Sequence, residues 1–81
     1  MTRDEAVNVI KKYVVENLGD IKAEDIDIDK TMTDYGVNSL DVIEVVSCSM
    51  RELKVRVPRD ELSDVRTVGQ LADKFVEYGG K

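Results

Sequence analysis

Apolar residues recur at steps of three or four in three segments of the chain, and this spacing is the feature that most limits its fold. The first segment follows Thr2 and Glu5, which have the spacing of a capping box. Its apolar face would consist of Val7, Ile10, Val14 and Leu18, and Gly19 follows as a typical stop signal. The pattern predicts an amphipathic helix that ends near Leu18.

Two further segments show the same pattern. Asn38 is a favoured N-cap for the second, and Gly36 before it suits a left-handed turn. This helix would have two adjoining apolar stripes, Leu40, Ile43, Val46 and Met50 on one and Val42, Val45, Ser49 and Leu53 on the other. Two stripes suggest that it both fills the core and presents an apolar strip to a partner. Thr67 and Gln70 form a capping box before the third segment, whose apolar face is Val68, Leu71, Phe75 and Val76.

The stretches between these helices lack a helical period. Residues 20–35 alternate acids with isoleucines, but the chain offers no convincing second strand, and an isolated strand is not stable. We expect a long ordered loop with one helical turn near residues 23–25, anchored by Ile26, Ile28, Met32 and Tyr35. Residues 54–58 predict a short extended link ending at Pro58, and residues 59–62 a single helical turn. The predicted fold is all-α, a small bundle of three main helices plus one short helix, in a single domain spanning residues 1–81.

The composition removes most catalytic chemistry from consideration. The chain has no histidine and one cysteine, Cys48, so it lacks the commonest general base and the usual zinc ligands. Nucleophilic triads and cysteine–histidine pairs are excluded for the same reason. A domain of 81 residues also has little room to enclose a large active-site pocket. We therefore expect no metal site and no catalysis by this chain alone.

The charge and hydropathy of the chain limit its partners. A net charge of −5 disfavours nucleic acid, whose backbone binds clusters of lysine and arginine. No apolar run approaches the roughly 18–20 residues that span a bilayer, so we expect no membrane association, and the N-terminus lacks the apolar stretch of a signal peptide. A lone cysteine cannot form an internal disulfide, which favours a reducing cytoplasm. We expect a cytoplasmic monomer whose partners are other proteins.

Ser39 would occupy the first position of the second helix, directly after its cap. Serine is common at helix starts, so its presence there needs no functional explanation. The same position lies near backbone amides that lack intrahelical acceptors and near the positive end of the helix dipole. A phosphate attached to the hydroxyl would be stabilised there, and a helix start should lie at the surface. From the residues alone, both interpretations stay open.

The residues around Ser39 resemble the modification site of acyl carrier proteins. The stretch DYGVNSLDVIEVV, residues 34–46, has a turn glycine before the serine and Leu-Asp after it, and the similarity extends over nearly the whole chain to the closing TVGQLADKF. In that family a serine carries 4′-phosphopantetheine, which a separate phosphopantetheinyl transferase installs from coenzyme A. The thiol of the arm holds acyl groups as thioesters. The resemblance assigns this attachment to Ser39 and implies a non-catalytic carrier.

The resemblance also implies where partner enzymes dock. On the second helix, Leu40 and Ile43 would supply apolar contacts near the arm. Asp41 and Glu44 would meet basic residues of synthase partners such as an acyltransferase or a ketosynthase. Without the resemblance, both acids would be interpreted as part of a solvated helix face.

Two departures from the family pattern bear on the pathway. Asn38 stands where most carriers have aspartate, and the second half of the helix leads into a basic stretch with Arg51, Lys54, Arg56 and Arg59. This combination differs from the acidic helix of fatty-acid carriers. Tyr35 before the glycine, Asn38 before the serine, Ser49-Met50 and the segment VGQLADKF are instead similar to the discrete carriers of polyketide pathways, among them the stand-alone donors of β-branching cassettes. A peptidyl or aminoacyl carrier, a fatty-acid carrier and a helical interaction module without the modification are the alternatives.

Overall fold

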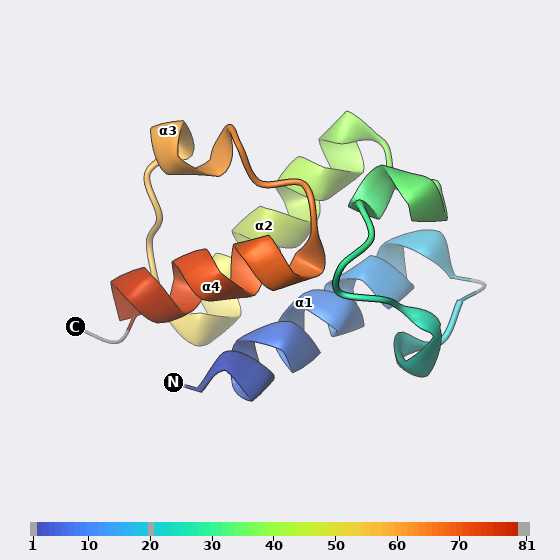
Figure 1. Ribbon diagram of the computed structural model, residues 1–81, viewed down its shortest axis with the longest axis horizontal. Coiled ribbons are helices and arrows are strands. Elements are labelled where there is room, and N and C mark those ends of the chain that lie inside the picture. Colours follow the sequence, from blue (N-terminus) through green and yellow to red (C-terminus); the bar gives the residue numbers. More distant parts are fainter. Residues whose placement is uncertain (1, 20, 80–81) are drawn as a thin grey trace.

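A computed structural model describes residues 2–19 and 21–79 of the chain, apart from the side chain of Ser39. The described residues form four α-helices and two 3₁₀ turns, arranged as Figure 1 shows. In chain order these are α1 (Arg3–Leu18), η1 (Ala23–Asp25), η2 (Met32–Tyr35), α2 (Ser39–Leu53), α3 (Arg59–Leu62) and α4 (Val68–Gly79). They contain no strand beyond one isolated bridge between Thr31 and Thr67. The predicted all-α bundle of three main helices and one short helix is confirmed.

The predicted caps of α1 and α2 fix where each helix begins. The Glu5 amide donates to the Thr2 hydroxyl over 3.1 Å, and the Asp41 amide donates to the Asn38 side chain over 2.9 Å. Gly19 ends α1 in a left-handed conformation with a φ of 80°, as its position predicts. Gly36 adopts a φ of 87° ahead of α2, also as expected. Because each signal lies within a few residues of its helix, local sequence suffices to place these boundaries.

The long connection between α1 and α2 is held in place by side chains and by a backbone bond to α4. Ile26 and Met32 are buried, and Ile28 and Tyr35 are half-buried, so all four expected anchors are confirmed. The predicted helical turn at residues 23–25 forms the 3₁₀ turn η1. The Gly69 amide donates to the Ile28 carbonyl over 3.0 Å, and a Cβ on Gly69 would meet that oxygen at 3.2 Å. The absence of a side chain at Gly69 therefore lets the loop lie against the start of α4.

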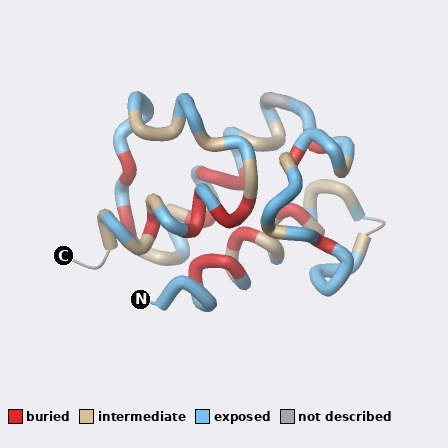
Figure 2. The backbone as a smooth tube through the Cα atoms, in the orientation of Figure 1, coloured by how far each residue is buried: buried red, intermediate tan, exposed pale blue. Residues whose placement is uncertain are grey.

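The core lies where α1 faces α2 and α4, seen as the buried segments in Figure 2. Its largest fully buried side chains include Phe75, Ile10, Leu71 and Val14. Beyond α2, the link before α3 buries Val55 and Val57 between exposed cations, which confirms the predicted extended alternation. Ion pairs join α1 to its neighbours: Arg3 pairs with Asp73 of α4 at 2.7 Å, and Lys12 pairs with Glu52 of α2 at 2.6 Å.

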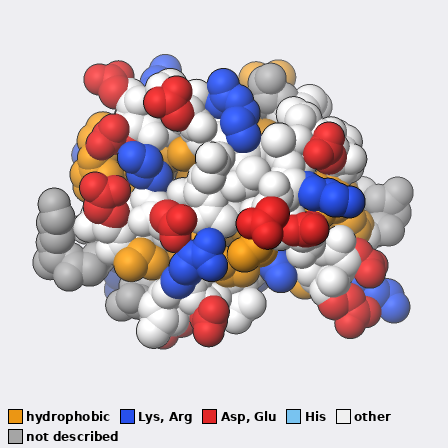
Figure 3. All heavy atoms as spheres, viewed as in Figure 1, with side chains coloured by type: hydrophobic (Ala, Val, Ile, Leu, Met, Phe, Trp, Pro, Cys, Tyr) orange, Lys and Arg blue, Asp and Glu red, His pale blue; other side chains and the backbone are white. Residues whose placement is uncertain are grey.

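Charges are distributed over the surface rather than segregated by sign on the face drawn in Figure 3. Acidic and basic side chains alternate there, with hydrophobic side chains showing between them. The net charge of −5 is therefore not expressed as one continuous acidic patch on this face.

Candidate functional site

Ser39 is the first residue of α2, as the sequence predicts, but its side chain lies outside the described residues. Directly before it, Asn38 caps the helix and Val37 is 1% exposed. Val37 and Val42 have the spacing of a hydrophobic staple, which fixes how a chain enters a helix. Sequence reasoning overlooked Val37, although this spacing was available to find it.

The start of α2 has the chemistry to hold a phosphodiester. The first amides of any helix lack intrahelical acceptors, and the dipole of this 15-residue helix places partial positive charge there. The exposed Asn38 is neutral, so it satisfies one of those amides without adding a charge that would repel a phosphate. Asp41 is the acid nearest in sequence, and it is half-buried. The residues at this helix start therefore fit a covalently attached phosphopantetheine group.

The predicted docking residues divide between two faces of α2. Leu40 is 77% exposed and Ile43 is 54% exposed, which makes them the large hydrophobic side chains most open to solvent among the described residues. Glu44 is also exposed, and it lies about 40° round the helix axis from Leu40. Leu40, Ile43 and Glu44 therefore share the outer face of α2. Asp41 lies about 100° from Leu40, toward the flank that includes Glu52, and is half-buried. The structure thus brings together Leu40, Ile43 and Glu44, with Asp41 beside them.

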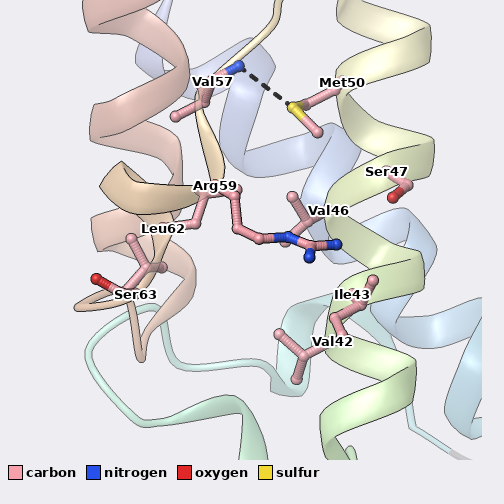
Figure 4. A pocket seen from close by; sticks show the side chains of 10 residues that line it. Val42, Ile43, Val46, Ser47, Met50, Val57, Arg59, Leu62 and Ser63 are labelled. Atoms are coloured by element: carbon pink, nitrogen blue, oxygen red, sulfur yellow. Dashed lines mark hydrogen bonds between the residues drawn. The ribbon is translucent and has the colours of Figure 1, made fainter.

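An apolar groove runs along α2 beside these residues, between α2 and α3 (Figure 4). It has a volume of about 470 Å³, and Val42, Ile43, Val46 and Met50 line its α2 side. A neighbouring hollow of about 330 Å³ extends toward the loop and shares Val42 and Ile43 with the groove. Sequence reasoning did not predict the groove, because its walls come from segments that meet only in the folded chain.

One group of pKa shifts among the described residues arises where α1 meets α2. Hydrogen bonds from Lys12 and then from Tyr13 hold the pKa of the Glu52 carboxyl below its usual range. The same carboxylate raises the pKa of Tyr13. These groups stabilise contacts between helices and lie on the flank of α2, away from the exposed Leu40 and Ile43.

Within the described part of the chain, no three metal-ligating side chains of histidine, cysteine, aspartate or glutamate gather in one place. No helix in residues 2–19 and 21–79 is long and apolar enough to cross a membrane.

Comparison with known proteins identifies the chain's family. A family model described as "Phosphopantetheine attachment site" matches residues 8–75. An acyl carrier protein of Rhodopseudomonas palustris (strain TIE-1) is 36% identical over 72 residues, covering 89% of this chain and 90% of that protein. The chain belongs to the acyl carrier protein family. An acyl carrier protein of Nitrobacter winogradskyi matches with the same identity and the same coverage.

Among solved structures, this acyl carrier protein is similar to a chain in the crystal structure of the curacin biosynthetic pathway HMG synthase in complex with acetyl donor-ACP. The two superpose with a TM-score of 0.85 at 26% sequence identity, covering 95% of this chain and 99% of the other. The family, the phosphopantetheine cofactor and the non-catalytic carrier role that the sequence implied are confirmed.

Proposed function

We propose that this acyl carrier protein holds acyl groups as thioesters on a 4′-phosphopantetheine arm attached to Ser39 and delivers them to synthase enzymes of polyketide biosynthesis. The observation that carries the proposal is the position of Ser39 at the capped start of a long helix, within the segment that matches the attachment-site family. When attached, the arm supplies a thiol that forms the thioester. The protein's own residues place that arm and present it to partners.

Each neighbour of Ser39 has a defined part in this function. Asn38 caps α2 and holds the Asp41 amide, so the backbone at the attachment point is fixed before any transferase binds. Val37 anchors the same turn to the core. Leu40 and Ile43 give a partner an apolar surface directly after the attachment point, because burying exposed leucine and isoleucine stabilises association. Glu44, and Asp41 at its side, attract basic residues of the partner.

We infer further that the carrier serves as a donor in a β-branching cassette. Its likeness to the chain crystallised with the curacin pathway HMG synthase, whose complex contains an acetyl donor-ACP, supports this role. The exposed cations Arg51, Lys54 and Arg56, which follow the acids along α2 and the link, also favour a partner unlike those that bind uniformly acidic carriers. A fatty-acid carrier and a peptidyl or aminoacyl carrier are the competing functions.

The attachment is tested by intact mass after incubation with coenzyme A and a broad-specificity phosphopantetheinyl transferase. We expect the mass to rise by one phosphopantetheinyl group in the unmodified sequence and in Ser47→Ala, and to stay constant in Ser39→Ala. Ser47 is a matched control because it is an exposed serine on the same helix. A mass that rises in Ser39→Ala would refute the assignment, and no rise in any variant, with a control carrier modified, would refute the carrier function.

The donor role is tested with the loaded protein. We expect acetyl transfer from the loaded carrier to an HMG synthase of a β-branching cassette to be faster than transfer to a fatty-acid ketosynthase. Glu44→Lys should raise the KM for the synthase roughly five-fold, the equivalent of about 1 kcal/mol. Glu24→Lys is the matched control, since Glu24 is also an exposed acid and lies on η1, away from α2. Preference for the ketosynthase, or efficient loading only with aminoacyl donors, would favour a competing function.

A further inference from the structure

Arg59 is the charged residue among those that line the apolar groove. It begins α3, and its side chain crosses the groove so that the guanidinium group lies near Val46 of α2 (Figure 4). The other lining residues are apolar apart from Ser47 and Ser63. The hydroxyl of Ser63 is already engaged, since it donates to the Asp60 carbonyl over 2.9 Å.

The guanidinium group of Arg59 has no protein partner among the described residues. No aspartate or glutamate forms an ion pair with it, whereas Arg3 pairs with Asp73 at 2.7 Å. Arg66, which lines the neighbouring hollow, donates to the carbonyls of Ser63 and Val65. Arg59 therefore keeps a planar set of N–H donors directed over an apolar surface, an arrangement that matches a carboxylate.

The groove lies within reach of the proposed attachment point. Val42 and Ile43 line it one helical turn after Ser39, and Val46 lies about 10 Å from Ser39 along the helix axis. An arm that folds back along α2 would place its acyl group between the groove walls. The acyl chain would then contact valine and isoleucine side chains, and its far end would approach Arg59.

We propose that Arg59 makes this groove selective for acyl groups that end in a carboxylate, that is, for monothioesters of dicarboxylic acids. The inference rests on attachment at Ser39 and not on the donor role. It names the acyl groups that the groove would retain, and an acetyl group, which ends in an uncharged methyl, is not among them. The apolar walls accommodate the carbon chain, and the guanidinium fork binds the terminal carboxylate. An acyl group with an uncharged end would leave Arg59 unpaired and gain the apolar contacts alone.

The test compares three forms of the protein that differ only at the end of the arm: the free thiol, the acetoacetyl thioester and the malonyl thioester. Acetoacetyl matches malonyl in size but ends in a neutral methyl ketone. Nuclear magnetic resonance reports on the Arg59 Nε–H and on the methyl groups of Val46 and Leu62. We expect the malonyl form to shift these signals relative to both other forms, and the difference to shrink at high ionic strength.

Variants separate a bound carboxylate from a guanidinium that only covers apolar surface with its stem. Arg59→Gln should reduce the malonyl-specific methyl shifts roughly 1.5- to 5-fold, the range for an ion pair partly open to water. Arg59→Lys should restore part of the effect. Arg56→Gln, which removes an exposed cation that does not line the groove, should leave the shifts unchanged.

The outcomes are distinguishable from those for the carrier function. Equal shifts in the malonyl and acetoacetyl forms, or shifts that persist in Arg59→Gln, would overturn the cargo assignment while leaving attachment at Ser39 intact. If the free-thiol form showed the same signals as the malonyl form, Arg59 would contact the arm rather than the acyl group. That result would also overturn the cargo assignment. Loading is verified separately by intact mass, and failure to load would refute the carrier function itself.

Discussion

Replacing Ser49 with alanine should make the protein more stable. Ser49 lies on α2 about 180° from Leu40, on the face that packs into the core, and it is 0% exposed. Among the described residues, its hydroxyl oxygen has no hydrogen-bond partner. A buried hydroxyl left unpaired costs about 1–3 kcal/mol because it loses its bonds to water and gains none in exchange. Ser49→Ala removes that group and leaves the rest of the side chain in place.

The expected gain in the free energy of unfolding is about 1–2 kcal/mol. Alanine also favours the helix over serine by up to about 0.5 kcal/mol, while the packing contacts of the lost oxygen offset part of the benefit. For a domain of this size, each kcal/mol corresponds to a rise of about 4–8 °C in Tm. Urea denaturation and thermal melts followed by circular dichroism measure both quantities.

Ser47→Ala is the matched control, because Ser47 is an exposed serine two residues away on the same helix. It should change stability by no more than about 0.5 kcal/mol, which is the helix propensity term alone. If Ser49→Ala were no more stable than the unmodified protein while Ser47→Ala behaved as expected, the reasoning would be refuted. That result would mean that the Ser49 hydroxyl is hydrogen-bonded in the folded protein, as a bond to a carbonyl of the preceding turn would achieve.

Three further predictions concern stability. Lys54 follows α2 with a φ of 55°, a left-handed conformation that costs a residue with a Cβ about 1 kcal/mol. Lys54→Gly should therefore raise the free energy of unfolding, measured by urea denaturation, by about 0.5–1 kcal/mol. A decrease in this free energy would contradict the prediction. Leu71 is fully buried, so Leu71→Ala should lower the free energy of unfolding by about 2–5 kcal/mol in the same assay, and a change under 1 kcal/mol would be inconsistent with a packed core. Because Lys12 lowers the pKa of Glu52 in the folded state, this carboxylate stabilises the fold above its unfolded pKa and loses the effect as the pH falls through its folded pKa. The stability advantage over Glu52→Gln should therefore be present at neutral pH and vanish in acid, and an advantage independent of pH would argue against the pair.

The features that the sequence predicted correctly depend on residues close together in the chain. The Thr67 hydroxyl accepts from the Gln70 amide over 3.0 Å, and the Gln70 side chain accepts from the Thr67 amide over 3.2 Å, as a capping box requires. Both bonds join residues three apart, so their spacing is visible without a structure. The same reasoning placed Ser39 at the start of α2, although its exposure is still a prediction.

The features that the sequence did not predict depend on contacts between distant segments. Gly69 was an unremarked position within α4, yet its amide holds the loop at Ile28, 41 residues earlier. The groove beside α2 exists because α3 and the link return alongside it. Which residues of the two apolar stripes on α2 would face the core was also open. The structure buries Val45, Val46 and Ser49 and exposes Leu40 and Ile43, so the first stripe is divided between core and solvent. Such choices depend on the packing of the whole chain, which no local pattern records.

The division of α2 into two faces separates the residues that stabilise this carrier from those proposed to bind its partners. Leu40 and Ile43 are largely exposed in the folded protein, as they are in the unfolded chain, so their hydrophobic surface contributes little to folding. Under the proposed function, the same surface contributes to binding when a partner covers it. Val45 and Ser49, on the opposite face, act on stability and lie out of a partner's reach. If the exposed face is the docking surface, as proposed, substitutions there should alter partner binding without unfolding the protein, and substitutions in the core should alter stability without changing which enzymes bind.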